Sequence, residues 1–139
     1  MKFSHTLETA SPAATIWTIW TAVGWWPEWD SELKSAQIEG AFREGATGNL
    51  TPKVGPPTKF SISQVVPNQS YTFTTQLLFC RLVVHRFIHQ NNPLAEKICF
   101  THEVSFVGPL AFLFYWLLGN RFRQALPGAM QQIKSLAEA

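Results

Sequence analysis

The histidines in the second half of the chain are the first candidates for acid–base chemistry. His102 interrupts a strand face whose other members are apolar: Ile98, Phe100, Val104 and Phe106. An imidazole on such a face is either satisfied by a partner in the core or directed into a cavity, where it transfers protons near neutral pH. His85, on the preceding strand, joins His102 only if the hairpin register allows it, because a slip of one residue reverses the face.

A metal or cofactor site is not expected. His85 and His89 are four residues apart, and on a strand this separates them by roughly 13 Å, too far to chelate one ion. The carboxylates Glu28, Asp30 and Glu32 lie close together in a segment that is typical of a solvated loop. The sequence also lacks the nucleophile-elbow, phosphate-loop and dinucleotide glycine patterns, so serine-hydrolase, nucleotide and hydride chemistry are unsupported.

Few polar groups are available to meet a ligand. Tyr71 and Gln64 offer hydrogen bonds. An arginine, either Arg81 or Arg86, can meet a carboxylate, and the strand register decides which of the two faces inward. If His102 or His85 removes a proton next to a carbonyl group, Tyr71 or an arginine is the candidate donor that stabilises the resulting enolate.

The segment GWWPEWD, residues 24–30, concentrates three tryptophans around a proline. Pro27 interrupts regular structure, so we expect a turn or a short helical hook. Rings of this size either staple the turn onto the core or form the wall of a pocket, and Trp29 is the candidate for both roles.

One helix and a series of strands precede the C-terminal region. Residues 2–8 alternate as a half-buried strand does. Between Ser11 and Gly24 the pattern predicts a helix, with Ser11 as its N-cap and Pro12 at the first helical position. After residue 31 the alternating pattern predicts strands at 33–39, 46–53, 58–66, 69–77, 80–90 and 95–107. Turn residues separate them, including Asn91-Asn92-Pro93, and short connections imply antiparallel neighbours.

The spacing of apolar residues over 109–137 predicts one long helix with two apolar stripes. A second stripe occurs only before Gly119, so the first half of the helix must be covered on both sides, by the first helices, a homodimer partner or a membrane surface. The stripe along the whole length is Phe112, Tyr115, Leu118, Phe122, Leu126, Met130, Ile133 and Leu136, and the second is Leu110, Leu113, Trp116 and Leu117.

Composition narrows the function classes. The chain has 139 residues, of which 14% are charged, and a net charge of +2, which is too small to indicate nucleic-acid binding. The longest apolar run, 107–118, is shorter than the roughly 20 residues that span a bilayer, so stable membrane insertion is not expected. Cys80 and Cys99 suit a reducing cytoplasm. A hairpin register with paired residue numbers summing to about 185 keeps them from forming a disulfide.

Together, these elements predict an α+β fold with a curved antiparallel sheet of about seven strands. The long C-terminal helix lies across its concave face, and two short helices follow strand one. Residues 1–139 fit a single domain. Because a straight helix cannot touch a curved sheet along its full length, we expect a cavity between them.

The order of several motifs resembles a known superfamily. ASPAATIWTIW followed by WPEWD is similar to the N-terminal signature of the START-like (SRPBCC, helix-grip) superfamily, in the branch named after polyketide cyclases and dehydratases. FREGATGNLTPK, FSISQVVPNQSYTFTTQL, FTHEVSFVGPLAFLF and LPGAMQQIKSLAE resemble the same branch in order and spacing. The resemblance implies a helix-grip fold that holds hydrophobic small molecules, without a universal set of catalytic residues.

Two functions follow as expectations. One is the binding of a hydrophobic or amphipathic small molecule, without a cofactor, between the sheet and the C-terminal helix. The other is a polyketide cyclase or dehydratase that uses His102 or His85 as acid or base. The candidate walls of the cavity are Trp29, Phe60, Phe73, His102, Phe112, Tyr115 and Trp116.

Overall fold

A computed structural model describes residues 1–90 and 96–139 of the chain. Seven strands form one antiparallel sheet in the order β1-β7-β6-β5-β4-β3-β2. The strands are β1 (Lys2–Thr9), β2 (Leu33–Ile38), β3 (Thr47–Pro52), β4 (Thr58–Val66), β5 (Ser70–Leu77), β6 (Cys80–His89) and β7 (Ile98–Val107).

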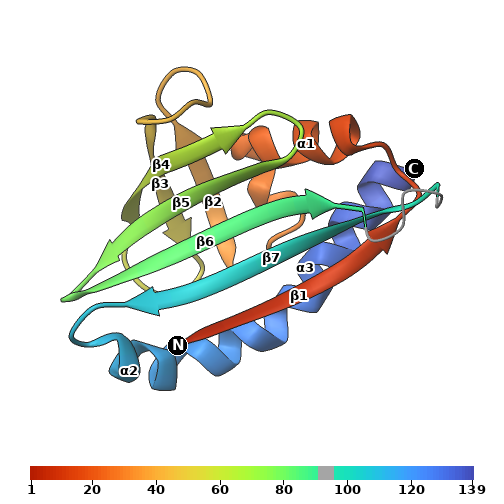
Figure 1. Ribbon diagram of the computed structural model, residues 1–139. Helices are drawn as coiled ribbons and strands as arrows, with labels where there is room; N and C mark the ends of the chain where they lie inside the picture. The colour runs from red at the N-terminus through yellow and green to blue at the C-terminus, as the bar shows by residue number, and fades with distance from the viewer. Residues whose placement is uncertain (91–95) are drawn as a thin grey trace.

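Helical elements follow the first and the last strands. They are α1 (Ala13–Thr21), the 3-10 helix η1 (Val23–Glu28), α2 (Ala111–Phe114), the π-helical turn η2 (Tyr115–Gly119) and α3 (Asn120–Glu138). Figure 1 shows the sheet curving around α3, with α1 near the C-terminal end of α3 and α2 at the opposite end of the molecule. The predicted helix-grip α+β fold is confirmed. The turn expected at Asn91–Pro93 lies outside the described residues.

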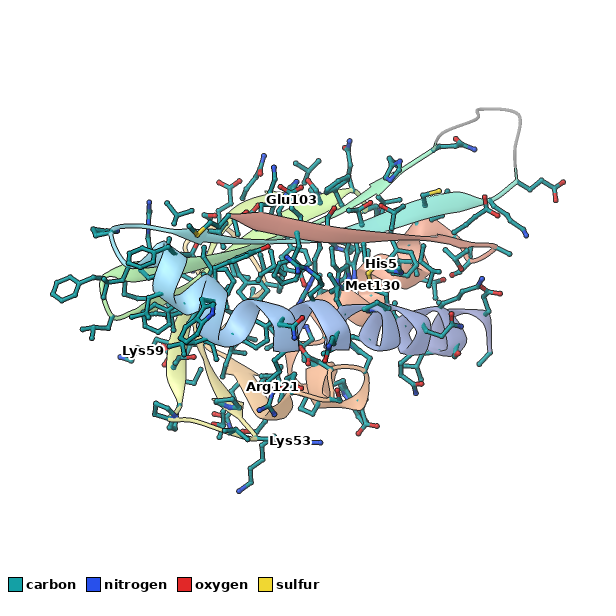
Figure 2. All side chains as sticks on the ribbon, turned by 90° about the horizontal axis from the view of Figure 1, so that it is seen from below. His5, Lys53, Lys59, Glu103, Arg121 and Met130 are labelled. Carbon is teal, nitrogen blue, oxygen red and sulfur yellow. The ribbon has the colours of Figure 1, made fainter. Side chains whose placement is uncertain are left out.

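The two faces of the sheet differ in polarity, as the alternating sequence pattern predicts. Figure 2 shows His5 and Met130 between the sheet and α3, whereas Glu103 lies on the other face. Met130 and Ile133 of α3 are completely buried against the inner face. The core is therefore one layer of side chains between the sheet and the helices.

The start of α1 differs from the expected cap. Pro12, in an extended conformation, occupies the N-cap position, and no side chain caps the helix. Ser11 lies one residue too early, and its hydroxyl donates to the carbonyl of Pro12 instead. The Thr9 hydroxyl accepts the Ser11 N–H at 3.1 Å and donates to Oε2 of Glu138 at 2.8 Å, which ties the end of β1 to the end of α3.

The predicted C-terminal stripe holds only in part. Phe112, at the start of the stripe, is 59% exposed, and Leu136, near its end, is 44% exposed. The π-helical turn η2 gives the physical reason at the start, because one extra residue per turn rotates the preceding side chains relative to those of α3. Leu118, Phe122 and Leu126 do pack against the core.

The register between β6 and β7 also differs from the expectation. Arg81 pairs with Val107 and Arg86 pairs with His102, so paired residue numbers sum to 188 (for example, 81 + 107) rather than to about 185. Cys99 pairs with His89, whereas Cys80 precedes Arg81 at the other end of β6. The register therefore places the two cysteines at opposite ends of this strand pair.

Candidate functional site

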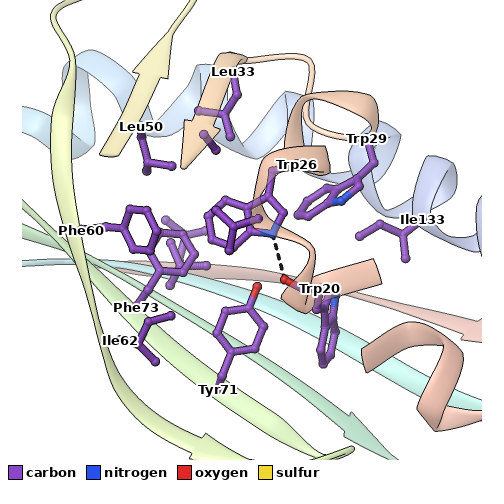
Figure 3. Packing of buried hydrophobic residues seen from close by; sticks show 14 of the residues in the cluster. Trp20, Trp26, Trp29, Leu33, Leu50, Phe60, Ile62, Tyr71, Phe73 and Ile133 are labelled. Atoms are coloured by element: carbon purple, nitrogen blue, oxygen red, sulfur yellow. Dashed lines mark hydrogen bonds between the residues drawn. The ribbon is translucent and has the colours of Figure 1, made fainter. Parts of the chain in front are cut away.

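The tryptophan-rich segment builds one wall of the core. Trp26 and Trp29 of GWWPEWD are buried, whereas Trp25 is 67% exposed. The indole N–H of Trp26 donates to the carbonyl of Trp20 at 2.8 Å, which fixes η1 to the end of α1 (Figure 3). The Trp26 ring packs against Phe73 and Phe60, with centroid distances of 5.2 and 5.6 Å. The segment is thus a staple whose two inner rings line the interior.

Arg86 lies in the middle of these rings. The β5–β6 register pairs it with Tyr71 on the inner face of the sheet, and the side chain is only 5% exposed. Its guanidinium carbon lies 4.9 Å from the ring centroid of Trp29 and 5.0 Å from that of Trp26. Phe73 and Tyr71 complete a box of four rings around the guanidinium, with their ring centroids 5.0 and 5.6 Å from the same carbon. Cation–π attraction to four rings supports the buried charge, since each contact contributes about 0.5–2 kcal/mol.

The polar partners of Arg86 are incomplete. One guanidinium N–H donates to the hydroxyl of Tyr71. Among the described residues, the Nε–H of Arg86 has no hydrogen-bond partner, and neither does the indole N–H of Trp29, whose ring contacts the guanidinium. Within the described part of the chain, Arg86 is in none of the ion pairs. A buried donor left without an acceptor costs about 1–3 kcal/mol, so an acceptor oxygen placed here would stabilise the site.

His102 lies next to this cluster but is already engaged. It is buried, and its Nε2 accepts the indole N–H of Trp20 at 3.1 Å. Burial, then the positive charge of Arg86 and then His5, holds the pKa of His102 well below 6.5. The ring is therefore neutral, with its proton on Nδ1, because the accepting nitrogen must carry the lone pair.

Tyr71 and Asp30 also have shifted acidities. Burial raises the pKa of Tyr71, although the charge and the hydrogen bond of Arg86 act in the opposite direction. The phenol therefore stays protonated and is available as a donor. Burial likewise raises the pKa of Asp30, offset by the hydrogen bond from the Glu32 N–H at 3.0 Å and by the charge of Arg86. In the described residues, Asp30 forms no ion pair with Arg86.

A groove of about 590 Å³ opens on the other side of Trp29. It runs between α1, η1 and the end of α3, rather than between the sheet and the middle of α3, where a cavity was expected. Trp29 separates this groove from the interior, because the ring also contacts Arg86 and His102. The residues that line it are mostly apolar: Ala14, Thr15, Thr18, Ile19, Ala22, Trp25, Glu28, Trp29 and Leu136.

Several predicted site residues gather around Arg86. Trp29, Phe73 and Tyr71 form three sides of its box, and Phe60 packs behind Trp26. His102 contacts Trp29, with ring centroids 5.9 Å apart.

Other predicted site residues lie elsewhere. His85 is on the outer face, where Nδ1 lies 2.8 Å from the Thr72 hydroxyl, so it does not share a wall with His102. Tyr115 faces inward near the far end of the sheet, against Phe106. Phe112 and Trp116, 59% and 76% exposed, face away from the sheet, because η2 turns this part of the helix outward.

The sequence analysis left open whether Arg81 or Arg86 faces inward, although the length of the turn between β5 and β6 decides between them. Strands β5 and β6 join through the two residues Leu78-Phe79. A two-residue hairpin turn fixes the pairing of every residue on both strands. Counting back from the pair Leu77 and Cys80 brings Arg86 opposite Tyr71.

Nothing in residues 1–90 and 96–139 brings three His, Cys, Asp or Glu side chains together in the way a metal ion requires.

Comparison with known proteins identifies the fold. No family model and no curated protein matches the sequence. A START superfamily protein from Mycobacterium smegmatis matches in structure with a TM-score of 0.71 at 16% identity, over 99% of this chain and 97% of the other. The di-domain ARO/CYC protein StfQ from the steffimycin biosynthetic pathway gives a TM-score of 0.78 at 14% identity, over 99% of this chain and 50% of StfQ.

Norcoclaurine synthase from Thalictrum flavum, in complex with dopamine and hydroxybenzaldehyde, has the same architecture. Its TM-score is 0.66 at 18% identity, over 98% of this chain and 85% of the synthase. The chain therefore has the START-like, helix-grip fold that the sequence motifs predicted.

Proposed function

We propose that this protein binds a small amphipathic molecule that presents an acidic or carbonyl oxygen to Arg86. The observation that carries the proposal is the buried guanidinium of Arg86, whose Nε–H has no acceptor among the described residues and which packs on Trp29, whose indole N–H has none either. An oxygen of the ligand supplies that acceptor. A hydrogen bond to a charged donor contributes about 1.5–3 kcal/mol, which favours an acidic ligand over its neutral ester by roughly tenfold or more.

The apolar body of the ligand occupies the groove between α1, η1 and α3. Its volume of about 590 Å³ is within the range of roughly 300–1,000 Å³ that is usual for small-molecule sites. Trp29 is the barrier between the groove and Arg86, so a change in its rotamer connects the two. The ligand then replaces the contact between the Trp29 ring and the guanidinium.

Solved structures with this fold support a small-molecule ligand. Norcoclaurine synthase holds dopamine and hydroxybenzaldehyde, and StfQ belongs to a biosynthetic pathway. A reducing, cytoplasmic location belongs to the same proposal, since both cysteines of the chain are buried.

The geometry favours binding over a cyclase or dehydratase that uses His102. A general base needs a lone pair directed at the substrate. The lone pair of His102 already accepts the indole N–H of Trp20. Arg86 and Tyr71 have the chemistry to stabilise an enolate, but this conformation leaves His102 unable to generate one.

The test compares three ligands that differ only in the head group: a medium-chain fatty acid, its methyl ester and the matching alkylamine. Binding is measured by tryptophan fluorescence and by the shift in melting temperature. We expect the acid to bind most tightly and the amine least. In Arg86→Met the acid and the ester bind equally, because the charged donor is gone.

Arg81→Met is the matched control. It removes an arginine from the same strand, but on the outer face, so the preference for the acid is retained. If Arg86→Met keeps that preference, Arg86 has only a structural role and the proposed function is wrong. Equal binding of all three ligands by the wild-type protein contradicts it as well.

A further inference from the structure

The turn between β5 and β6 has an unusual composition. A two-residue hairpin turn requires backbone conformations that favour Asn and Gly, yet the residues here are Leu78 and Phe79. Both are 67% exposed, and Phe79 has a φ of +51°. The turn between β4 and β5 follows the usual rule, with Asn68 at a φ of +60°. Strain and exposure at one apolar turn point to a function of that turn.

The turn is part of a larger apolar surface, called here the apolar end. The Leu110 N–H donates to the carbonyl of Phe79 at 3.1 Å, which joins the turn to the start of the C-terminal helical region. Figure 1 shows that the β5–β6 turn and α2 lie at the same end of the molecule. The exposed side chains of the apolar end are Leu78, Phe79, Val107, Phe112, Trp116 and Leu117.

A positive charge lies beside the apolar end. Neither of the stretches that contribute to it, 45–95 and 104–137, contains an Asp or a Glu. On the outer face of the sheet, Arg81 pairs with Val107 of the apolar end on one side and with Gln76 on the other. Lys59 lines a surface hollow together with Gln76 and Glu39, so Arg81 is the cation on which the argument rests. Among the described residues, neither Lys59 nor Arg81 forms an ion pair.

We propose that the apolar end docks the protein onto an anionic membrane surface, with Phe79, Phe112 and Trp116 entering the interface. The exposed area, about 600 Å² by typical side-chain areas, is at the upper limit for a soluble monomer. A membrane surface takes up a few apolar rings, with arginine and lysine beside anionic head groups.

The attachment is peripheral. None of the helices in the described part of the chain combines the length and the apolar character needed to cross a bilayer. A few inserted side chains and a few cations give reversible binding that weakens as salt screens the charges. This proposal is independent of the ligand of Arg86, and the two are tested separately.

The experiment is co-sedimentation of the full chain with phosphatidylcholine vesicles, with and without phosphatidylglycerol. We expect binding to the anionic vesicles that decreases with salt. The double variant Leu78→Asn, Phe79→Gly restores the usual turn chemistry and is expected to fold at least as stably. It should weaken vesicle binding about tenfold or more, since the Phe79 ring no longer enters the membrane and the apolar end also loses Leu78. Arg81→Gln should weaken binding to the anionic vesicles about fivefold.

Val66→Ser is the matched control, because it removes a partly exposed apolar side chain beside the opposite hairpin turn. It should bind vesicles like the wild-type protein. Light scattering in the absence of lipid follows the oligomeric state. The proposal is wrong if no vesicle binds the protein, or if the double variant binds as well as the wild type. It is also wrong if the apolar end instead forms a dimer that the double variant dissociates.

Discussion

The cluster around Arg86 and the apolar end both lower the stability of the fold, but for opposite reasons. The first buries a charge and two donors without acceptors, and the second exposes rings to water. Substitutions that remove such features usually stabilise a protein, and the recurrent cost is lost function. The two regions differ in what would satisfy them: an oxygen atom for the cluster and an apolar phase for the end. Because these two requirements differ in chemistry, each region suits a different kind of partner.

The largest contrast is expected between two tryptophans. Trp26→Ala leaves a cavity among packed rings and should lower the free energy of unfolding by about 3–5 kcal/mol. Trp116→Ala, at a site 76% exposed, should change it by about 0.5 kcal/mol or less. Urea unfolding of both variants measures the difference. Similar losses in the two variants would mean that Trp116 is packed, and the apolar end would lose its basis.

Arg86→Met is expected to leave the free protein as stable as the wild type or to stabilise it, by up to about 4 kcal/mol. A methionine fills much of the same volume and removes a buried charge that lacks a carboxylate partner. The melting temperature without ligand measures this. A large loss of stability would show that the ring contacts of Arg86 outweigh its burial, and the argument for a missing acceptor would fail.

Acid should destabilise the protein through His102. Its folded-state pKa lies well below 6.5 because of burial and Arg86, so below about pH 6.5 the unfolded chain takes up a proton that the folded chain does not. The free energy of unfolding should therefore fall with decreasing pH by up to about 1.4 kcal/mol per pH unit. Urea titrations from neutral pH downward measure the slope. In His102→Gln, which keeps an acceptor for Trp20, this part of the slope should disappear.

The smallest effect is expected at the strained turn. Phe79→Gly relieves a positive φ and should raise the free energy of unfolding by about 0.5–1 kcal/mol. Val66→Ser tests the other turn, where Asn68 already suits its conformation, and should bring no gain. Thermal melts of both variants are sufficient. If Phe79→Gly destabilises the protein, the ring makes contacts that hold the turn, and the turn is not strained for the sake of docking.

Most of the fold could be predicted from local patterns. Period-two alternation and turn residues located the strands, because side-chain direction on a strand depends only on position. The N-cap of α1 could not be placed to the residue, since Ser11 and Pro12 compete for it. The outward rotation of Phe112 and Trp116 depends on η2, and the stretch YWLLG reads as an ordinary helix.

The candidate site was harder to predict from the sequence, because it depends on the register between strands. The same strand carries Arg81 outside and Arg86 inside, and the sequence distinguishes them only through the length of the turn at Leu78-Phe79. The register expected between β6 and β7, with paired residue numbers summing to about 185, differs from the observed sum of 188, and the face shared by His102 was left open. The two donors without acceptors are a property of three-dimensional packing, so no linear pattern reports them.

The length of α3 has a consequence for orientation. It contains 19 residues from Asn120 to Glu138, which at 1.5 Å per residue separate its two ends by roughly 28 Å. The apolar end lies beyond one terminus, and Leu136 at the other lines the groove. A molecule standing on a bilayer by its apolar end would thus hold the opening of the groove far above the lipid head groups, facing the aqueous phase and whatever solute or protein diffuses there.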